Sequence, residues 1–275
     1  MMFPERELLR LIPRVLRARD FHLYLEGGKR LTDLWRSGGK AVLGHKPPRV
    51  LGELKNAAER GLFTSLPHPM ERRFIKALGE FFPGQSFRLY NDESALYRVL
   101  EEAGFAGPCG DPAFALPASQ EQNKSHVSLW RPFLGDDGQA PVPVLVPVLP
   151  WPLGPAVLVV NKSAETSFPQ GELIPPVLLA PAIRALYDLV AVLKNFVPKR
   201  PLYPKIEKVL KGSLFRRRGI YLAGETGMSK EKYEALFRRF LESGFLIPPS
   251  PREPFILPLS MSPGEESKLA ELLSP

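Results

Sequence analysis

Apolar residues in the N-terminal part of the chain follow first helical and then strand-like spacing. Residues 5–19 place leucine, isoleucine and valine at helical intervals between arginines, which predicts an amphipathic helix that is interrupted or bent at Pro13. Residues 21–35 contain two runs typical of strands, joined by a turn signal over 26–29 that contains two glycines. This second pattern predicts a β-hairpin.

The next segments predict two helices, a strand and a third helix. Residues 47–62 and 69–84 each open with proline and close with glycine nearby, the asymmetry expected of helices. Residues 86–90 are typical of a strand, and 93–103 of a helix. The alternation of strands with helices indicates an α/β architecture.

Residues 104–155 differ in character because many of the 31 prolines lie there. In the run 141–155, proline alternates with aliphatic residues, and proline donates no backbone hydrogen bond. The run therefore predicts an edge strand or extended segment rather than a central strand. Residues 156–160, Ala-Val-Leu-Val-Val, predict a buried strand.

The C-terminal half is predicted to be mainly helical. Residues 175–196 form a long apolar pattern with Pro181 near its start. A helix over 232–243, ended by Gly244, leads into a strand, and Ser262 with Glu265 forms a capping box for the last helix.

Charge and cysteine content exclude several kinds of site. The single cysteine, Cys109, excludes an internal disulfide, and the four histidines lack metal-ligand spacing, so no metal site is predicted. Charged residues recur through the N-terminus and no long uncharged apolar run exists, which predicts a soluble, cytoplasmic chain without a membrane segment.

The net charge is +8, and residues 199–218 hold a large share of the basic side chains. Such a cluster favours binding of nucleic acid or another polyanion by counterion release. No recognised nucleic-acid motif surrounds it, so a solvated or subunit-facing surface is the preferred interpretation.

Several short motifs appear in an order that points to a known family. They are Gly27-Gly28, Leu34-Trp35, Ser37-Gly38, Leu43-Gly44-His45 and Pro47-Pro48. Residues 27–95 resemble the N-terminal part of class-III aminotransferases, the ornithine- and acetylornithine-type enzymes of pyridoxal-phosphate (PLP) fold type I. Residues 151–189 are similar to the family's Pro-Leu-Gly strand and the long helix after it, and 216–273 to its C-terminal domain.

The resemblance implies an α/β fold of the PLP-dependent transferase (fold type I) kind. The large domain is reduced, because 104–151 is too short for the family's missing strand–helix units. An α+β small domain is expected from both termini. The expected division is 1–70 packing with the small domain, 71–197 as the large domain, and 198–275 as the small domain.

In the resembling family, a turn of sequence Asn-Ser-Gly-Ala-Glu-Ala holds the cofactor phosphate on backbone amides. The matching turn here contains Asn91, Asp92, Glu93 and Ser94, so a carboxylate replaces the serine and another replaces the glycine. Two negative charges about 5 Å from a phosphate dianion oppose its binding by several kcal/mol. We therefore expect a vestigial turn that no longer holds phosphate.

The family's Schiff-base lysine is expected shortly before the Pro-Leu-Gly strand, but 144–150 contains no lysine. Lys162 is the nearest candidate and lies after the strand. The family's other site positions are also altered: Asp136-Asp137 falls in a polar turn, 171–176 lacks the phosphate-binding threonine, and Arg252 lies several positions early. His45 is interpreted as a residue that shapes a turn.

Three hypotheses follow from these observations. The leading one is an aminotransferase-like homodimer without PLP chemistry, acting as a binding or assembly protein, with room for an unknown small-molecule ligand in a remnant cleft. The second is an active PLP-dependent aminotransferase with Lys162 as the first suspect for the Schiff base. The third is polyanion binding through 199–218.

Overall fold

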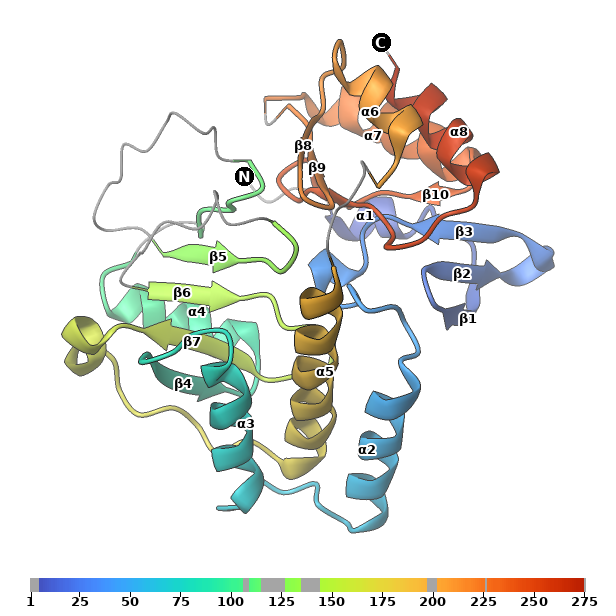
Figure 1. Ribbon diagram of the computed structural model, residues 1–275. Helices are drawn as coiled ribbons and strands as arrows, with labels where there is room; N and C mark the ends of the chain where they lie inside the picture. Colours follow the sequence, from blue (N-terminus) through green and yellow to red (C-terminus); the bar gives the residue numbers. More distant parts are fainter. Residues whose placement is uncertain are drawn as a thin grey trace. The chain divides into compact units, whose positions relative to one another are not determined.

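The computed structural model describes residues 5–105, 109–114, 127–134, 144–196, 202–225 and 227–274. The chain forms two compact units, and each contains segments that are distant in sequence (Figure 1). Unit 1 comprises residues 1–46, 133–135 and 196–275; unit 2 comprises residues 47–132 and 136–195. Unit 1 is therefore built largely from the two ends of the chain.

Unit 1 contains two small sheets and four helices among the described residues. The strands are β1 (Val15–Arg19), β2 (His22–Leu25), β3 (Arg30–Asp33), β8 (Arg216–Arg218), β9 (Tyr221–Ala223), β10 (Phe245–Leu246) and β11 (Phe255–Ile256). The helices are α1 (Glu5–Leu9), α6 (Pro204–Leu210), α7 (Lys230–Glu242) and α8 (Pro263–Leu273). The sheet orders are β1-β2-β3-β10 and β11-β9-β8.

The hairpin predicted over 21–35 is confirmed. Strands β2 and β3 pair antiparallel across a short 3-10 turn (Glu26–Gly28), and Gly27 and Gly28 both have positive φ, which suits glycine. Strand β10 then pairs parallel with β3, with Phe245 opposite Thr32. This pairing joins the C-terminal segment to the N-terminal sheet.

The amphipathic helix predicted over 5–19 is wrong in its second half. Helix α1 ends at Leu9, and residues 15–19 form β1, which pairs with β2. Asp20, with φ of 49°, makes the tight turn between them. The strand forms for two reasons: Pro13 ends the helical segment, and β2 supplies backbone hydrogen-bond partners for β1. Burial does not decide it, because Leu16 is 71% exposed.

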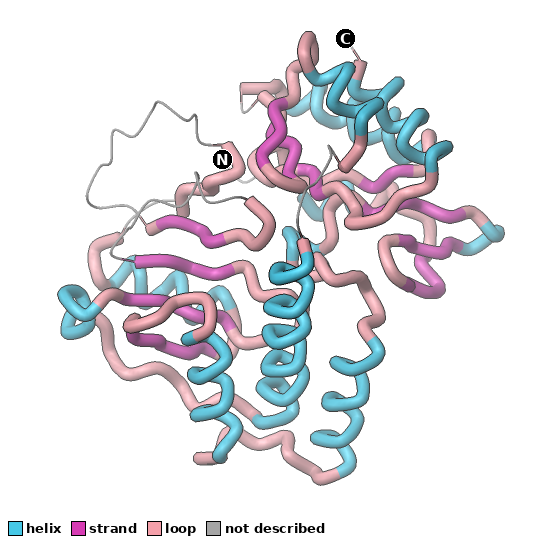
Figure 2. Tube along the Cα trace, viewed as in Figure 1, coloured by secondary structure: helices cyan, strands magenta, loops and turns pink. Residues whose placement is uncertain are grey.

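Unit 2 is a three-layer α/β/α arrangement. Its elements are α2 (Pro48–Glu59), α3 (Pro69–Gly79), β4 (Ser86–Tyr90), α4 (Glu93–Glu102), β5 (Ser128–Trp130), β6 (Val144–Pro147), β7 (Ala156–Val160), a 3-10 helix (Lys162–Ser167) and α5 (Pro176–Asn195). The sheet order is β4-β7-β6-β5. Figure 2 shows α3 and α5 on one side of this sheet and α4 on the other.

Two apolar cores lie on the two faces of that sheet. Leu89, Val157 and Val159 face the helices α2, α3 and α5. Alternate positions, including Tyr90 and Leu158, pack against α4. The predicted strand over 156–160 is confirmed, and every residue of β7 is buried because both faces are covered.

The prediction of an edge or extended segment over 141–155 is wrong for residues Val144–Pro147, which form β6. Strand β6 lies inside the sheet, antiparallel to β7 and parallel to β5. Proline is tolerated because Pro147 ends the strand, whereas pairing with β7 involves only Val144 and Leu145. The missing N–H of Pro147 thus falls beyond that ladder.

Helix α5 is the long apolar helix predicted from the sequence, and it contacts α2 and α3. Its length and composition would allow it to cross a membrane, but 44% of its most apolar window is buried inside the protein. Core helices pass the same test, so this is weak evidence for a membrane span. Arg184 and Asp188 form an ion pair on the helix.

Candidate functional site

Three strands of unit 2 direct their carboxyl ends to the same edge of the sheet. Tyr90, which ends β4, lies opposite Ala156, which begins the antiparallel β7. Trp130, which ends β5, lies opposite Pro147, which ends the parallel β6. In α/β proteins ligands bind outside the carboxyl ends of strands, which makes this edge the candidate site.

The predicted vestigial turn lies at this edge, between β4 and α4. Asp92 is the N-cap of α4, and its carboxylate accepts a hydrogen bond of 2.8 Å from the backbone N–H of Ala95. Glu93 begins the helix, and both Glu93 and Ser94 are exposed. The helix N-terminus is therefore capped by the chain's own carboxylate, which satisfies a donor that a ligand would otherwise use.

A third carboxylate reaches the same turn from a distant part of the chain. Oε2 of Glu172 accepts hydrogen bonds from the backbone N of Asn91, at 2.8 Å, and from Asn91 Nδ2, at 2.7 Å. No local pattern predicts this contact, because it joins residues 81 positions apart.

These residues do not fit a phosphate dianion. Asp92 and Glu172 already accept hydrogen bonds at the turn, and Glu93 adds a further negative charge. At an effective dielectric near 20, each carboxylate about 5 Å from a dianion costs several kcal/mol before screening.

Lys162 lies at the other end of the sheet from the turn. It follows Val160, which is opposite Ser86 at the start of β4, whereas the turn follows Tyr90 at the end of β4. Four residues of strand separate the two ends by about 13 Å. The structure does not bring Lys162 to the turn.

The described lysines of unit 2 do not lie in the segments that form this edge. Lys55 and Lys76 lie on α2 and α3, Lys162 begins the 3-10 helix, and Lys194 is in the last turn of α5. Lys124 and the aspartates 136–137 fall outside the described residues.

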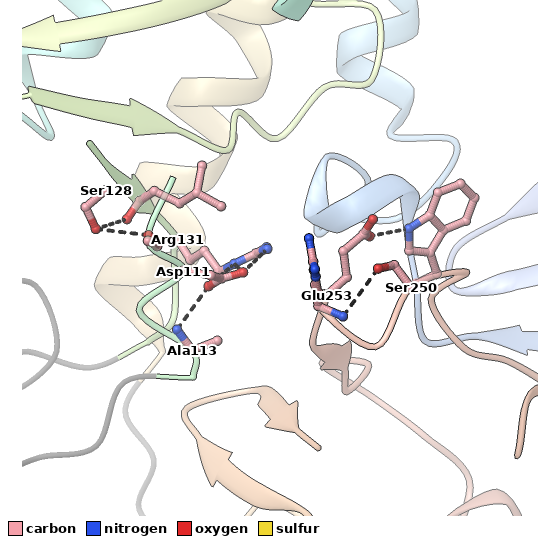
Figure 3. Close-up of polar contacts among 10 residues, drawn as sticks. Asp111, Ala113, Ser128, Arg131, Ser250 and Glu253 are labelled. Carbon is pink, nitrogen blue, oxygen red and sulfur yellow. Dashed lines mark hydrogen bonds and ion pairs between the residues drawn. The ribbon is translucent and has the colours of Figure 1, made fainter. Parts of the chain in front are cut away.

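A buried ion pair at this edge was missed by sequence reasoning. Arg131, directly after β5, is only 3% exposed and donates two-pronged hydrogen bonds to Asp111, with Nη2 to Oδ2 at 2.6 Å (Figure 3). Asp111 also accepts a bond from the backbone N of Ala113. Only the isolated motif Gly-Asp-Pro marked this position in the sequence.

Two buried polar groups at this edge, the Tyr90 hydroxyl and the Trp151 indole N–H, make no hydrogen bond with the described residues. The Cys109 thiol lies near the start of β5 instead. Burial raises the pKa of the Cys109 thiol, although a hydrogen bond with Tyr97 opposes that effect. Cys109 is therefore protonated at neutral pH and is not a ready nucleophile.

In unit 1, the stretch that resembles the aminotransferases forms a buried polar network. Asp33 Oδ1 accepts from the backbone N of Trp35 and Arg36, both at 2.8 Å, and its Oδ2 lies 2.8 Å from His45 Nε2. The Arg36 side chain is fully buried and donates to the carbonyls of Asp33, Val42 and Ile256. Burial lowers the pKa of Arg36 to about 10, so it remains charged at neutral pH.

The His45 contact agrees with a role in shaping the turn before α2. Trp35 Nε1 donates to Glu253 Oε2 at 2.6 Å, and the backbone N of Arg252 donates to Ser250 (Figure 3). Within unit 1, the Trp35–Glu253 bond and the bond from Arg36 to the carbonyl of Ile256 join the 34–46 stretch to the C-terminal segment.

Glu265 connects the last helix to the N-terminal sheet. The predicted capping box with Ser262 is confirmed, and Oε1 of Glu265 also contacts His22, Thr32 and Arg30 at 2.9, 2.9 and 3.2 Å. Burial alone would raise the pKa of Glu265, but the hydrogen bonds from Ser262, His22 and Thr32 outweigh it and lower the pKa to about 2.

The basic segment 199–218 is partly used for internal contacts. Arg217 pairs with Glu207, and Lys205 Nζ donates to Ser267 at 2.5 Å. Lys208, Lys211 and Arg216 are exposed, and 199–201 lie outside the described residues. In the described part of the chain, no group of three or more His, Cys, Asp or Glu residues could hold a metal ion.

Comparison with known proteins agrees with this fold. No family model matches the chain. It is 28% identical to an uncharacterised protein of Treponema pallidum, with 92% of each chain aligned, and 25% identical to one of Borreliella burgdorferi, with 95% and 90% aligned. It is also 31% identical to glutamate-1-semialdehyde 2,1-aminomutase of Thermus thermophilus over 71 residues, 26% of this chain and 17% of that enzyme.

Solved aminotransferases share the fold at low sequence identity. Ornithine δ-aminotransferase of Plasmodium falciparum superposes with a TM-score of 0.68 at 13% identity, over 94% of this chain and 91% of that one. Acetylornithine aminotransferase of Elizabethkingia anophelis gives 0.61 at 14%, over 94% and 92%, and a transaminase with PLP bound gives 0.66 at 13%, over 95% and 89%. The resemblance and the PLP-transferase fold class predicted from the sequence are confirmed.

Proposed function

We propose that the chain is an aminotransferase-like protein that has lost PLP binding and catalysis and acts as a binding or assembly protein. The observation that carries this proposal is the chemistry of the edge where β4, β5 and β6 end. Three carboxylates surround the turn, and the described lysines lie in other segments. The carboxylates repel the phosphate of PLP. The position of the described lysines in other segments leaves the PLP aldehyde without an amine partner here.

The reduced large domain gives a second line of support. Two relatives align over at least 90% of both chains, so the compact form recurs in proteins of comparable length. The polar network around Arg36 and Asp33 lies within unit 1, whereas the turn belongs to unit 2. Loss of the cofactor is therefore compatible with a stable fold.

The test is a titration of the purified full chain with PLP, followed by absorption spectroscopy. We expect only the spectrum of free PLP, because none of the described lysines of unit 2 lies in the segments that form this edge. A saturable aldimine band that survives removal of free PLP would overturn the proposal.

An active aminotransferase remains the second candidate function, because structural neighbours include a transaminase with PLP bound. Under this hypothesis, Lys162→Ala abolishes the aldimine band and Lys55→Ala leaves it intact. The register of β4 and β7 argues against Lys162 as the amine. An aldimine band that is lost only with Lys162 would establish this candidate.

We further propose that the assembled form is a homodimer. Apolar side chains are exposed near the start of α5: Phe63 and Leu66 are 60% and 62% exposed and Leu173 is 41% exposed, and Val177 N donates to Leu62 O. Light scattering with size exclusion should give twice the chain mass, and Phe63→Ser with Leu66→Ser should reduce it. A monomer at all concentrations contradicts this part of the proposal.

The weaker polyanion hypothesis rests on the exposed Lys208, Lys211 and Arg216. It predicts retention on heparin that falls as salt rises. Retention that does not change with salt would exclude the electrostatic mechanism.

A further inference from the structure

The connection between β7 and α5 lies along β4, the edge strand of the unit 2 sheet. Arg88 Nε donates to Pro169 O at 3.0 Å, and the backbone N of Glu172 donates to Leu89 O at 2.7 Å. A Cβ added to Gly171 would lie 2.5 Å from Leu89 N, so only glycine permits this approach. The connection thus covers the open side of β4, where backbone N–H and C=O groups would otherwise be unpaired.

The same close approach places the Glu172 carboxylate at the residue that precedes the N-cap of α4. Its Oε2 accepts both the backbone and side-chain N–H donors of Asn91, immediately before the N-cap Asp92. The N-terminal end of a helix carries partial positive charge and attracts anions. Glu172 therefore makes the contacts that a free anion at this position would make.

We infer that Glu172 is a built-in carboxylate ligand of this turn, which closes it to free anions and fastens the β7–α5 connection onto β4. This inference rests on the proposed loss of cofactor binding and explains part of it. Because Glu172 is tethered, its effective concentration at the turn is on the order of millimolar or higher. A weakly bound free anion competes poorly with it.

The charged groups around Glu172 affect how well a free anion can compete with it for Asn91. Asp92 and Glu93 repel any incoming anion, and Arg88, which is engaged with Pro169 O and Glu165, faces the connection from β4. Burial raises the pKa of the neighbouring Tyr90, and the charge of Glu172 adds to that increase. Tyr90 therefore stays protonated and adds no further negative charge.

Amide exchange tests the contact directly. In wild type, the Asn91 backbone amide should be protected from exchange with solvent, because its hydrogen is bonded to Glu172. Exchange of the Asn91 amide should rise about ten-fold or more in Glu172→Ala, because its acceptor is lost. The matched control is Glu165→Ala, a carboxylate of the same connection that contacts Arg88 and not Asn91. Equal protection of Asn91 in wild type and Glu172→Ala would overturn the inference.

Inorganic phosphate tests the competition. Asp92→Ser with Glu93→Gly removes two carboxylates, and adding Glu172→Ala removes the third. We expect the triple variant to bind phosphate at least about ten-fold more tightly than the double variant in calorimetry. Equal affinity, including no binding by either, contradicts a closing role for Glu172. A covalent PLP adduct on wild type would instead contradict the proposed function, and the exchange test on Asn91 would still report on Glu172.

Discussion

The stretch that follows β3 in unit 1 and the turn that follows β4 in unit 2 both resemble the aminotransferases, but they have changed to different degrees. After β3, the motifs Leu34-Trp35, Ser37-Gly38 and Leu43-Gly44-His45 are retained, and Asp33, Arg36 and His45 are held in buried polar contacts. After β4, Asp92 and Glu93 replace serine and glycine, and both are exposed. The stretch after β3 thus keeps the family's motifs within a buried polar network, whereas the turn after β4 carries exposed carboxylates at the positions where the resemblance implies serine and glycine.

The largest effect is expected at Arg36. Replacing Arg36 with Met leaves the carbonyls of Asp33, Val42 and Ile256 buried without this donor. We expect a loss of about 3–5 kcal/mol in the free energy of unfolding, measured by urea denaturation. Arg19→Met, at an exposed arginine of β1, is the control and should change stability by less than about 0.5 kcal/mol. Similar losses in both variants would show that the Arg36 network does not hold unit 1.

A smaller loss is expected for Gly44→Ala. Gly44 has φ of 98°, and an added Cβ would lie 3.1 Å from the Asp20 carbonyl oxygen. The strained backbone and close contact should cost about 1–3 kcal/mol. Gly52→Ala, in the open on α2, should instead stabilise by about 0.5–1 kcal/mol. The midpoint temperature of thermal unfolding should therefore fall in Gly44→Ala and rise in Gly52→Ala.

Glu265 should make unit 1 sensitive to acid. Its folded pKa of about 2 lies below the ordinary value of 4.5, so its contribution is complete above pH 4.5 and is lost as pH falls toward 2. Because Glu265 is partly solvated, Glu265→Gln should cost only about 1–2 kcal/mol at neutral pH. The free energy of unfolding, measured with urea, should fall less steeply between pH 6 and pH 2.5 in the variant than in wild type. Parallel profiles would contradict the assigned hydrogen bonds.

The smallest effect should appear at the altered turn. Asp92→Ser with Glu93→Gly restores the family's residue types and keeps a side chain able to cap α4, so stability should change by less than about 1 kcal/mol. Asp92→Ala, which removes the cap seen with Ala95, should cost about 1 kcal/mol. Chemical denaturation compares the two. If the double variant loses more stability than Asp92→Ala, the carboxylates are needed for folding. The contrast drawn between the two regions would then be wrong.

Local patterns in the sequence predicted most of the elements. The Gly27-Gly28 hairpin, the helix ended by Gly244 and the capping box of Ser262 each depend on neighbouring residues, and each is found as expected. Helix 5–19 and the strand at 144–147 were wrong because tertiary pairing decided them. The partner strands β2 and β7 supplied backbone bonds that no local pattern reveals.

The candidate site was only partly predictable. The substitutions at Asp92 and Glu93 were visible because the resemblance fixed their positions. The Glu172–Asn91 contact and the Arg131–Asp111 pair join residues 81 and 20 positions apart, so they required the fold. Sequence order also could not show that Lys162 lies at the opposite end of β4 from the turn, which follows from the strand register.

We propose that the chain offers PLP neither a phosphate site nor a Schiff-base amine. The most direct test of this proposal is the intact mass of the full-length protein after incubation with PLP at low molar excess and reduction with borohydride. We predict the unmodified mass, apart from scattered adducts on exposed lysines that phosphate does not compete away. A single stoichiometric adduct on one lysine, protected by prior addition of phosphate, would contradict the account.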